Sequence, residues 1–246
     1  MAVLVTRPHP DNEATASALR GRGHEVLLAP MLRFEAIATG DDLDGRYDAV
    51  IVTSANALRA VDLAGHSILA RPLFAVGENT AEAARAAGFD KVLSAGGDAT
   101  NLRDLLRGRI KAKELKKTAR LIYLAGADLS RDLAGELGED GFDVVTRTTY
   151  RMVALSTLPR DALEAFAANR IEAVLHYSAR SVRAFVEAVR AAGIEISALS
   201  VPQCCLSASL AAILREAGAT RAKAAVRPDE GALFEALERA LRSGLA

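Results

Sequence analysis

The segments DAVIVTSANALRAV, residues 48–61, and EAVLHYSARSVRAF, residues 172–185, are two copies of one pattern. In each copy a short apolar run ends in a small hydroxyl residue, and a helical pattern begins immediately after it. An apolar strand followed at once by a helix is typical of a parallel sheet that helices cover. The hydroxyl residue is therefore expected at a helix N-terminus, beside the carboxyl end of a strand.

The segments around these two copies also recur, so the chain reads as three units in one order, written twice. VLVTRP at residues 3–8 returns as LIYLAG at 121–126, and FAVGENTAEAARAAGF at 74–89 returns as CLSASLAAILREAGA at 205–219. Strands that alternate with helices in this way predict two doubly wound α/β domains with parallel sheets. Two such domains facing one another make a cleft, which favours a ligand-binding role.

Periodicity alone allows either two successive domains or one domain inserted into the other. Two β-prone segments favour the insertion, because MLRFEAIAT at 31–39 and TTYRMVALS at 148–156 alternate past the point where a sheet strand should stop. These segments are able to pair as an antiparallel connector. The expected division is domain one at 1–34 plus 156–246, domain two at 40–147, and the connector at 35–39 and 148–155.

Composition indicates a soluble enzyme or binding protein. Half of the residues are apolar, and Lys plus Arg equal Asp plus Glu at 31 each. Tryptophan is absent, and no basic stripe with stacking aromatics is present, so a nucleic-acid partner is not expected. No apolar run approaches the length of a membrane helix, and the first residues read as a strand rather than a signal peptide. We expect a cytoplasmic protein that does not bind membranes.

The residues that usually hold cofactors or metals do not form their usual motifs. The sequence has no glycine-rich dinucleotide fingerprint, no Walker loop and no paired-cysteine zinc spacing. Its four histidines lack the spacing of a helical metal pair, and the adjacent Cys204 and Cys205 are expected to fill core volume on opposite faces of a strand. We therefore expect no cofactor and no metal. The histidines are His9, His24, His66 and His176.

Small and hydroxyl residues instead mark the strand-to-helix junctions. In a parallel sheet these junctions share the carboxyl edge, where free backbone N–H groups bind anions. The alternative interpretation is that the same side chains only cap helices and turn the chain. Candidate caps are Ser54, Asp98, Asp128, Ser178, Ser207 and Asp229.

Taken in order, these segments resemble the uroporphyrinogen-III synthase family over both halves of the chain. The resemblance rests on VLVTRP, VIVTSANAL, AVGENTAEAARAAGF, the LAG strand end, the TTY connector, YSARSVRAF and AVRPDEGALFEAL. It implies two flavodoxin-like domains, one inserted in the other, joined by a two-stranded β connector. It also implies an enzyme, a cyclising hydro-lyase of haem and tetrapyrrole biosynthesis.

The implied substrate is hydroxymethylbilane, a linear tetrapyrrole with eight carboxylates and one labile hydroxymethyl group. The family closes it to uroporphyrinogen III, with inversion of ring D through a spiro intermediate. The resemblance makes Tyr150 the candidate proton donor to the departing hydroxyl, since a tyrosine hydroxyl is protonated at neutral pH. The substrate contacts that it implies are Arg7, Ser54, Gly77, Asn79, Ser178, Ser207 and Ser209.

A second class of function fits the same pattern. Two α/β lobes on a β connector also describe a non-catalytic protein that binds a carboxylated ligand. The tyrosine at position 150 and turnover itself distinguish the enzyme from that alternative. We assume a monomer, and the resemblance implies a transient contact with hydroxymethylbilane synthase, the preceding enzyme that delivers the bilane.

Overall fold

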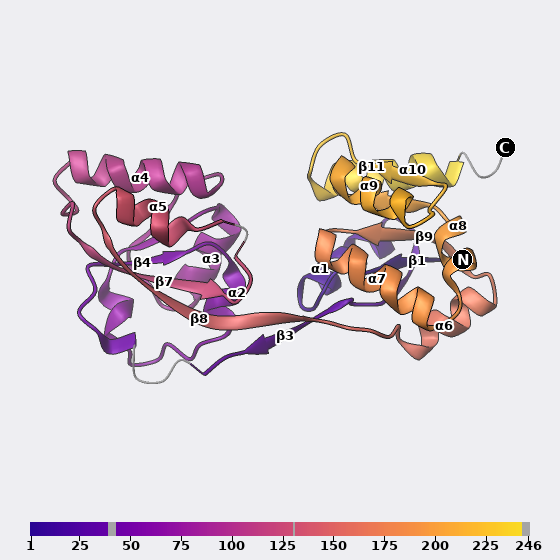
Figure 1. The fold of residues 1–246 in the computed structure, drawn as a ribbon, viewed down its shortest axis with the longest axis horizontal. Coiled ribbons are helices and arrows are strands. Elements are labelled where there is room, and N and C mark those ends of the chain that lie inside the picture. The colour runs from indigo at the N-terminus through magenta and orange to yellow at the C-terminus, as the bar shows by residue number, and fades with distance from the viewer. Residues whose placement is uncertain (39–42, 130, 243–246) are drawn as a thin grey trace. The chain divides into compact units, whose positions relative to one another are not determined.

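A computed structural model describes residues 1–38, 43–129 and 131–242, and the chain divides into two compact units (Figure 1). Unit 1 consists of Met1–Phe34 and Val153–Ala246, and unit 2 consists of Glu35–Met152. Both are mixed α/β structures with a parallel sheet. The expected boundary between connector and inserted domain, at residues 39 and 40, lies outside the described residues.

Unit 1 holds a five-stranded sheet in the order β11-β10-β9-β1-β2, and each neighbouring pair is parallel. Strand β1 pairs with β2 on one side and with β9 on the other, so the two separate parts of the sequence build one sheet. The elements are β1 (Ala2–Val5), α1 (Asp11–Gly21), β2 (Glu25–Leu28), α6 (Arg160–Ala167), β9 (Ile171–His176), α7 (Ala179–Ala191), α8 (Glu195–Ser200), β10 (Gln203–Cys205), α9 (Ala208–Glu216), β11 (Ala222–Ala224) and α10 (Glu230–Arg242).

The second sheet has the order β3-β8-β7-β4-β5-β6, and its pairs from β8 to β6 are parallel. Strands β3 (Leu32–Ala36) and β8 (Asp143–Ala154) each contain residues of both units. The other elements of unit 2 are β4 (Ala49–Val52), α2 (Ala55–Arg59), η2 (Ser67–Ala70), β5 (Leu73–Ala75), α3 (Glu78–Ala86), β6 (Val92–Ser94), α4 (Ala99–Lys111), β7 (Arg120–Gly126) and α5 (Leu133–Glu139).

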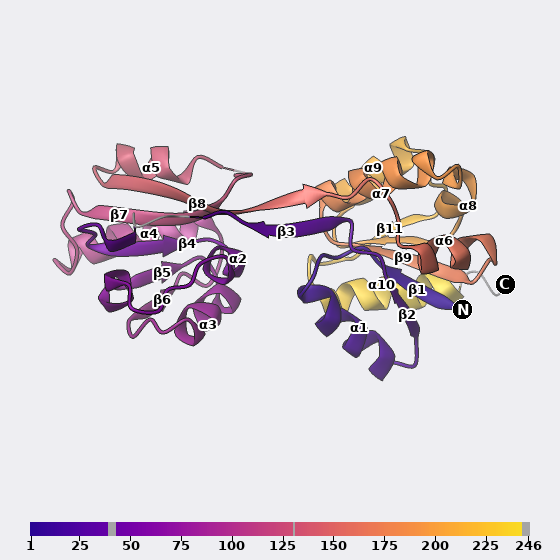
Figure 2. The same ribbon diagram turned by 90° about the horizontal axis from the view of Figure 1, so that it is seen from below.

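The central strands of each sheet are buried on both faces, and their apolar side chains alternate between two cores. In β4, Val50 and Val52 pack with α2 and α3, whereas Ala49 and Ile51 pack with α4 and α5. The same alternation in β1 separates a core under α6 to α9 from a core under α1 and α10, as Figure 2 shows for α7, α9 and α1. In a strand that is buried on both faces, polar residues are accommodated only at the two ends.

Strand β8 pairs with β3 as well as with β7. Two hydrogen bonds, from the Ile37 N–H to the Thr149 carbonyl (2.7 Å) and from the Leu155 N–H to the Met31 carbonyl (3.0 Å), follow an antiparallel register. On its other side β8 is parallel to β7, with a register shift between Ala125 and Gly126. The strand thus continues past the carboxyl end of β7.

The predicted helix starts are confirmed at several junctions and wrong at one. The Ser54 and Ser178 hydroxyls accept hydrogen bonds from the first-turn N–H groups of α2 and α7, and Asp98 forms a capping box at α4. Asp128 does not begin a helix, because α5 starts at Leu133 and its N-cap is Asp132. No helix in the described ranges is long and apolar enough to cross a membrane.

The two adjacent cysteines fill core volume, as predicted. Cys205 belongs to the core under α6 to α9, and Cys204 belongs to the core under α1 and α10. Both are free thiols, and burial raises the pKa of each to about 12. They therefore remain neutral thiols at physiological pH.

A buried polar chain lies at the end of β9. The Gln203 amide donates to the carbonyls of Ala198 (2.8 Å) and Val201 (3.0 Å), so its oxygen faces His176 Nε2 at 2.9 Å and accepts from it. His176 is fully buried, and burial lowers its pKa to about 4. Its neutral form is the one that fits this chain.

We predict that His176 makes the folded protein sensitive to mild acid. Its pKa is lower in the folded protein than in the unfolded chain, so the unfolded chain binds more protons as pH falls from 6.5 toward 4. The free energy of unfolding should therefore fall by about 2 kcal/mol between pH 7 and pH 5. Urea titrations at the two pH values measure this change.

The matched variants are His176→Gln, which removes the titrating group, and His9→Gln, which removes an exposed histidine. The first should lose most of the pH dependence, and the second should keep it. An unchanged pH dependence in His176→Gln would show that another group titrates in this range.

Candidate functional site

A cavity of about 410 Å³ opens at the carboxyl edge of the unit 2 sheet. It lies where β4, β5 and β7 end and where α4 and α5 begin, and its volume is within the range of small-molecule pockets, roughly 300 to 1,000 Å³. Three hydroxyl side chains, two carboxylates and one guanidinium are among the residues around it. The lining residues are Thr53, Val76, Gly97, Asp98, Ala99, Tyr123, Gly126, Asp128, Leu129, Arg131, Leu133 and Tyr150.

Tyr150, the candidate proton donor, lines this cavity. It lies in β8 opposite Gly126, at the register shift between β7 and β8, and its carbonyl accepts a hydrogen bond from the Ala127 N–H (2.8 Å). A Cβ on Gly126 would lie 2.7 Å from Cζ of Tyr150 and 2.9 Å from its hydroxyl oxygen. The absence of a side chain at Gly126 therefore allows the half-buried phenol ring to lie across the end of β7.

A second tyrosine hydroxyl meets a threonine hydroxyl on the cavity wall. Tyr123 of β7 is 2 % exposed, with its ring in the core under α4 and α5, and its hydroxyl lies 2.9 Å from Oγ1 of Thr53 at the end of β4. Burial raises the pKa of Tyr123, the Thr53 hydrogen bond opposes the shift, and the nearby Tyr150 adds to it. Tyr123 is therefore a neutral hydroxyl at the pH of the cell.

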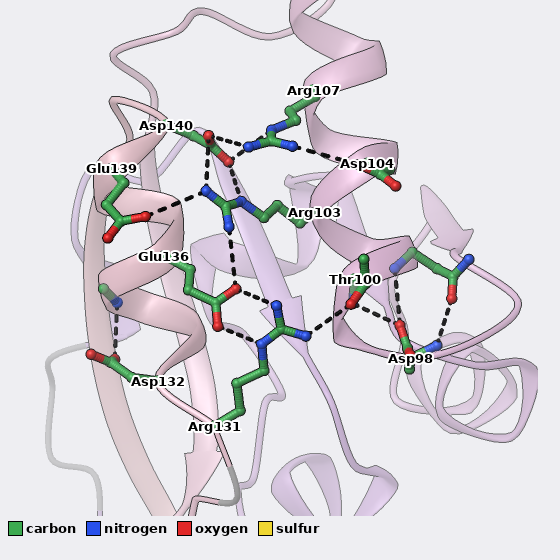
Figure 3. A network of polar contacts seen from close by, with 12 residues as sticks. Asp98, Thr100, Arg103, Asp104, Arg107, Arg131, Asp132, Glu136, Glu139 and Asp140 are labelled. Carbon is green, nitrogen blue, oxygen red and sulfur yellow. Dashed lines mark hydrogen bonds and ion pairs between the residues drawn. The ribbon is translucent and has the colours of Figure 1, made fainter.

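Arg131 lines the cavity and is held by the helices on either side (Figure 3). Its Nε and one terminal nitrogen bind the two oxygens of the Glu136 carboxylate, the second of these bonds being 2.6 Å long. Its other terminal nitrogen donates to Oγ1 of Thr100 (2.9 Å) on α4. These bonds fix the guanidinium plane, since a bidentate carboxylate pair is directional.

Asp98 contributes negative charge to the same wall. Its carboxylate accepts from the N–H groups of Thr100 (2.7 Å) and Asn101 (3.1 Å), and these hydrogen bonds hold its pKa below the usual value. It is therefore ionised near neutral pH. Asp128, which follows β7, is an exposed residue of the same lining.

A clamp of two arginines on one aspartate joins α4 to the end of α5 (Figure 3). Arg103 donates to the two oxygens of Asp140 at 2.6 and 3.2 Å, and Arg107 donates to the same oxygens at 3.0 and 2.7 Å. Asp140 is 14 % exposed, and the two guanidinium groups hold its pKa far below its usual range. The clamp fixes the two helices whose first turns border the cavity.

The predicted contacts of unit 2 lie beside this cavity rather than in its lining. Ser54 follows Thr53, but its hydroxyl accepts the Asn56 N–H at 3.3 Å as a helix cap. Gly77 follows Val76 and is the N-cap residue of α3, and Asn79 lies in the first turn of that helix. The capping interpretation of Ser54 therefore holds for its side chain.

In unit 1 the predicted contact Arg7 belongs to an ion-pair cluster. Its two terminal nitrogens lie 3.3 Å from Asp11 and 3.2 Å from Glu230, and its guanidinium lies 4.8 Å from the centre of the Tyr177 ring. The hydroxyls of Tyr177 (3.0 Å) and Thr15 (2.6 Å) meet the same Glu230 oxygen. The arginine charge is thus balanced by carboxylates of its own unit.

The three predicted serines of unit 1 are also at helix starts. Ser178 Oγ accepts the Ser181 N–H at 3.1 Å and lies 2.9 Å from the Ser181 hydroxyl. Ser207 is the N-cap residue of α9 without a side-chain cap bond, and its hydroxyl lies 2.9 Å from that of Ser209. Ser207 and Ser209 are exposed or partly exposed at this edge, with their hydroxyls paired to each other.

The structure brings together residues that the sequence does not predict as a site. Tyr123 lies inside an apolar strand, which makes it a weaker candidate than Tyr150, and Arg131 precedes a helix with no motif around it. One available signal is the junction Thr53-Ser54, of which the threonine rather than the serine lines the cavity, and the candidate caps Asp98 and Asp128 line it too. In the described part of the chain, no group of three His, Cys, Asp or Glu side chains is placed to hold a metal ion.

Comparisons with known proteins agree on one family. The family model described as uroporphyrinogen-III synthase HemD matches residues 13–235. Two solved structures have the same fold over nearly their whole length. They are a uroporphyrinogen-III synthetase from Helicobacter pylori (19 % identity, TM-score 0.64, 98 % of this chain and 99 % of that one) and a mutant uroporphyrinogen III synthase from Thermus thermophilus (19 %, 0.56, 99 % and 100 %). No curated protein sequence matches the chain significantly.

The clamp on Asp140 leads to a prediction about the stability of unit 2. Asp140→Asn leaves Arg103 and Arg107 without their shared charge partner, and the free energy of unfolding should fall by about 1 to 3 kcal/mol at pH 7. The pKa of Asp140 is lower in the folded protein than its ordinary value of 3.8. Its contribution to the free energy of unfolding is therefore present above pH 3.8 and is lost as the pH falls below that value.

Asp104→Asn is the matched control for this measurement. Asp104 is 67 % exposed and lies 3.7 Å from Arg107, so its loss should change stability by less than about 0.5 kcal/mol. Urea titrations of both variants at pH 7 make the comparison. Equal effects of the two substitutions would contradict the clamp.

Proposed function

The chain belongs to the uroporphyrinogen-III synthase family, and we propose that the reaction of this family, carried out by a cyclising lyase, takes place with its reacting group in the cavity that holds Tyr150. The family match extends over residues 13–235 and includes every element that borders the cavity. The observation that carries the assignment of the site is that Tyr150, Tyr123 and Thr53, three residues with hydroxyl groups, line one cavity. The family match does not favour the alternative of a non-catalytic binding protein.

The reaction needs only weak acid catalysis from the protein. The pyrrole nitrogen of ring A supplies the electron pair that expels the hydroxyl group, and a proton donor converts that hydroxyl to water. The C–O bond breaks with its electrons on oxygen, and a cationic azafulvene remains. The substituted carbon of ring D attacks it, the spiro intermediate fragments and recloses, and the final loss of a proton from ring D returns a proton to the donor.

Tyr150 is our candidate for that donor. It lines the cavity, its phenol ring is fixed between β8 and the bare backbone of Gly126, and it is half-buried, so water is partly excluded around it. A fixed donor that needs no reorganisation is the arrangement that lowers such a barrier.

We also propose that the strand-to-helix junctions bind the substrate carboxylates through their backbone N–H groups. The proposed contacts are Arg7, Ser54, Gly77, Asn79, Ser178, Ser207 and Ser209. The support is that Ser54, Gly77, Ser178 and Ser207 are N-cap residues, next to the free N–H groups of a helix start. Arg7 would contribute through its positive charge only when a ligand competes with Asp11 and Glu230.

The remaining proposals concern architecture and partners. We propose two flavodoxin-like domains, at 1–34 plus 156–246 and at 40–147, with 35–39 and 148–155 as a two-stranded β connector. The pairing of β3 with β8, which contain part of these two segments, supports this. We further propose a cytoplasmic monomer that meets hydroxymethylbilane synthase transiently. The instability of the bilane, which closes spontaneously, is the chemical reason for such a contact.

We predict that the purified protein converts freshly generated hydroxymethylbilane mainly to isomer III. The bilane is supplied in a coupled assay, and the oxidised porphyrins are separated into isomers I and III by chromatography. Spontaneous closure gives isomer I, so the no-enzyme reaction is an internal reference. Isomer I alone from folded protein would overturn the proposed function and favour stoichiometric binding.

We predict that Tyr150→Phe lowers the turnover number for isomer III by about 10- to 100-fold and leaves measurable activity. The phenol is one weak acid among several contributions, so its loss should not abolish the reaction. Tyr47→Phe is the control, because Tyr47 is a buried tyrosine of the same unit outside the cavity lining. Complete loss of activity in folded Tyr150→Phe would contradict this shared role.

A further inference from the structure

We propose that Thr53 and Tyr123 act as one unit that donates a second hydrogen bond to the departing hydroxyl of the substrate, beside Tyr150. This inference rests on the proposed function. The two side chains come from adjacent strands, β4 and β7, and both line the cavity that contains Tyr150. Their hydroxyl oxygens are 2.9 Å apart.

The hydrogen bond between Thr53 and Tyr123 uses only one of their two O–H groups as a donor. Each hydroxyl carries one proton, and one proton lies in the hydrogen bond between the two oxygens. Within the described ranges, neither hydroxyl has another hydrogen-bond partner. Whichever oxygen donates within the pair, the other O–H remains for a ligand. The hydrogen bond between the two oxygens restricts the direction of this remaining O–H group, because it holds the oxygen that carries the group in place.

The fold itself does not need the Tyr123 hydroxyl. The ring packs in the core under α4 and α5, where a phenylalanine would fill the same space, and among the described residues the hydroxyl forms a hydrogen bond with Thr53 alone. Thr53 is half-buried at the cavity, so water can satisfy its oxygen if the tyrosine hydroxyl is removed. A buried hydroxyl that stability does not require is a candidate for function.

The charges around the cavity indicate a neutral oxygen as the ligand of this donor. Asp98 is ionised and Asp128 is a further carboxylate on the lining, while the charge of Arg131 is already paired with Glu136. A substrate carboxylate in this cavity would be repelled by the carboxylates of Asp98 and Asp128, because charges interact more strongly in a partly buried site than in bulk water. The hydroxymethyl group is the uncharged oxygen of the bilane, so it is the part of the substrate that this cavity accepts.

Burial determines what the pair can do with its proton. Because burial raises the pKa of Tyr123, this hydroxyl is a poorer acid than an exposed phenol. The pair therefore donates a hydrogen bond and keeps its proton, whereas Tyr150 transfers one. Such a hydrogen bond strengthens as negative charge develops on the leaving oxygen, so its effect belongs to the transition state.

The test uses the full chain with the variants Tyr123→Phe and Thr53→Val in the isomer assay. Each should lower the turnover number for isomer III by about 10-fold and change KM by less than about twofold. The double variant should lose less than the product of the two single losses, since the residues act as a unit. Thr53→Ser keeps the hydroxyl and should recover most of the activity that Thr53→Val loses.

Tyr47→Phe, which removes a buried hydroxyl outside the cavity, should leave the turnover number unchanged. Thermal unfolding followed by circular dichroism checks that each variant folds. If Tyr123→Phe does not fold, the turnover numbers of Thr53→Val and Thr53→Ser test the inference on their own. Wild-type turnover numbers in both single variants would overturn the inference, as would a rise in KM alone. Isomer I alone from the wild-type protein would overturn the proposed function instead.

Discussion

Helices cover both faces of the two sheets, so the side chains of a central strand such as β4 alternate between two apolar cores and neither face is open to water. Polar chemistry is therefore restricted to the ends of the strands. In a parallel sheet all carboxyl ends lie at one edge, and the helices that follow them begin there with free N–H groups. The cavity of unit 2 is a consequence of this arrangement, because β4, β5 and β7 end together while β8 continues beside them.

The polar groups at this edge are of two kinds. Most of the charged ones are paired, Arg131 with Glu136, and Arg103 and Arg107 with Asp140 (Figure 3). The two ion pairs with Asp140 join α4 to the end of α5. The second kind is the hydroxyls of Thr53, Tyr123 and Tyr150, which carry no net charge and are stable where the surroundings are partly apolar.

The sequence is sufficient for features that depend on local pattern. The apolar run AVIV at 49–52 predicts a strand covered on both faces, and Ser54 and Ser178 cap the helices that follow them. Features that depend on register over long separations are not predictable in this way. The contact of Tyr123 with Thr53 joins residues 70 positions apart, and Arg7 meets Glu230 across 223 positions. The predicted helix start at Asp128 is wrong because nothing local distinguishes this residue from Asp132.

The weakness of the available acids fits the chemistry of the proposed reaction. A carboxylic acid in this cavity would be ionised near neutral pH unless burial raised its pKa, whereas a phenol keeps its proton without any such adjustment. As the C–O bond breaks, positive charge develops on the pyrrole ring and negative charge on the leaving oxygen. In the proposed function the hydroxyls of Thr53 and Tyr150 would face the developing negative charge, and the carboxylates of Asp98 and Asp128 in the same lining would favour the positive ring. A substrate carboxylate inside this cavity would be repelled by the carboxylates of Asp98 and Asp128, so under the proposed function the cavity would favour the one uncharged group that has to leave.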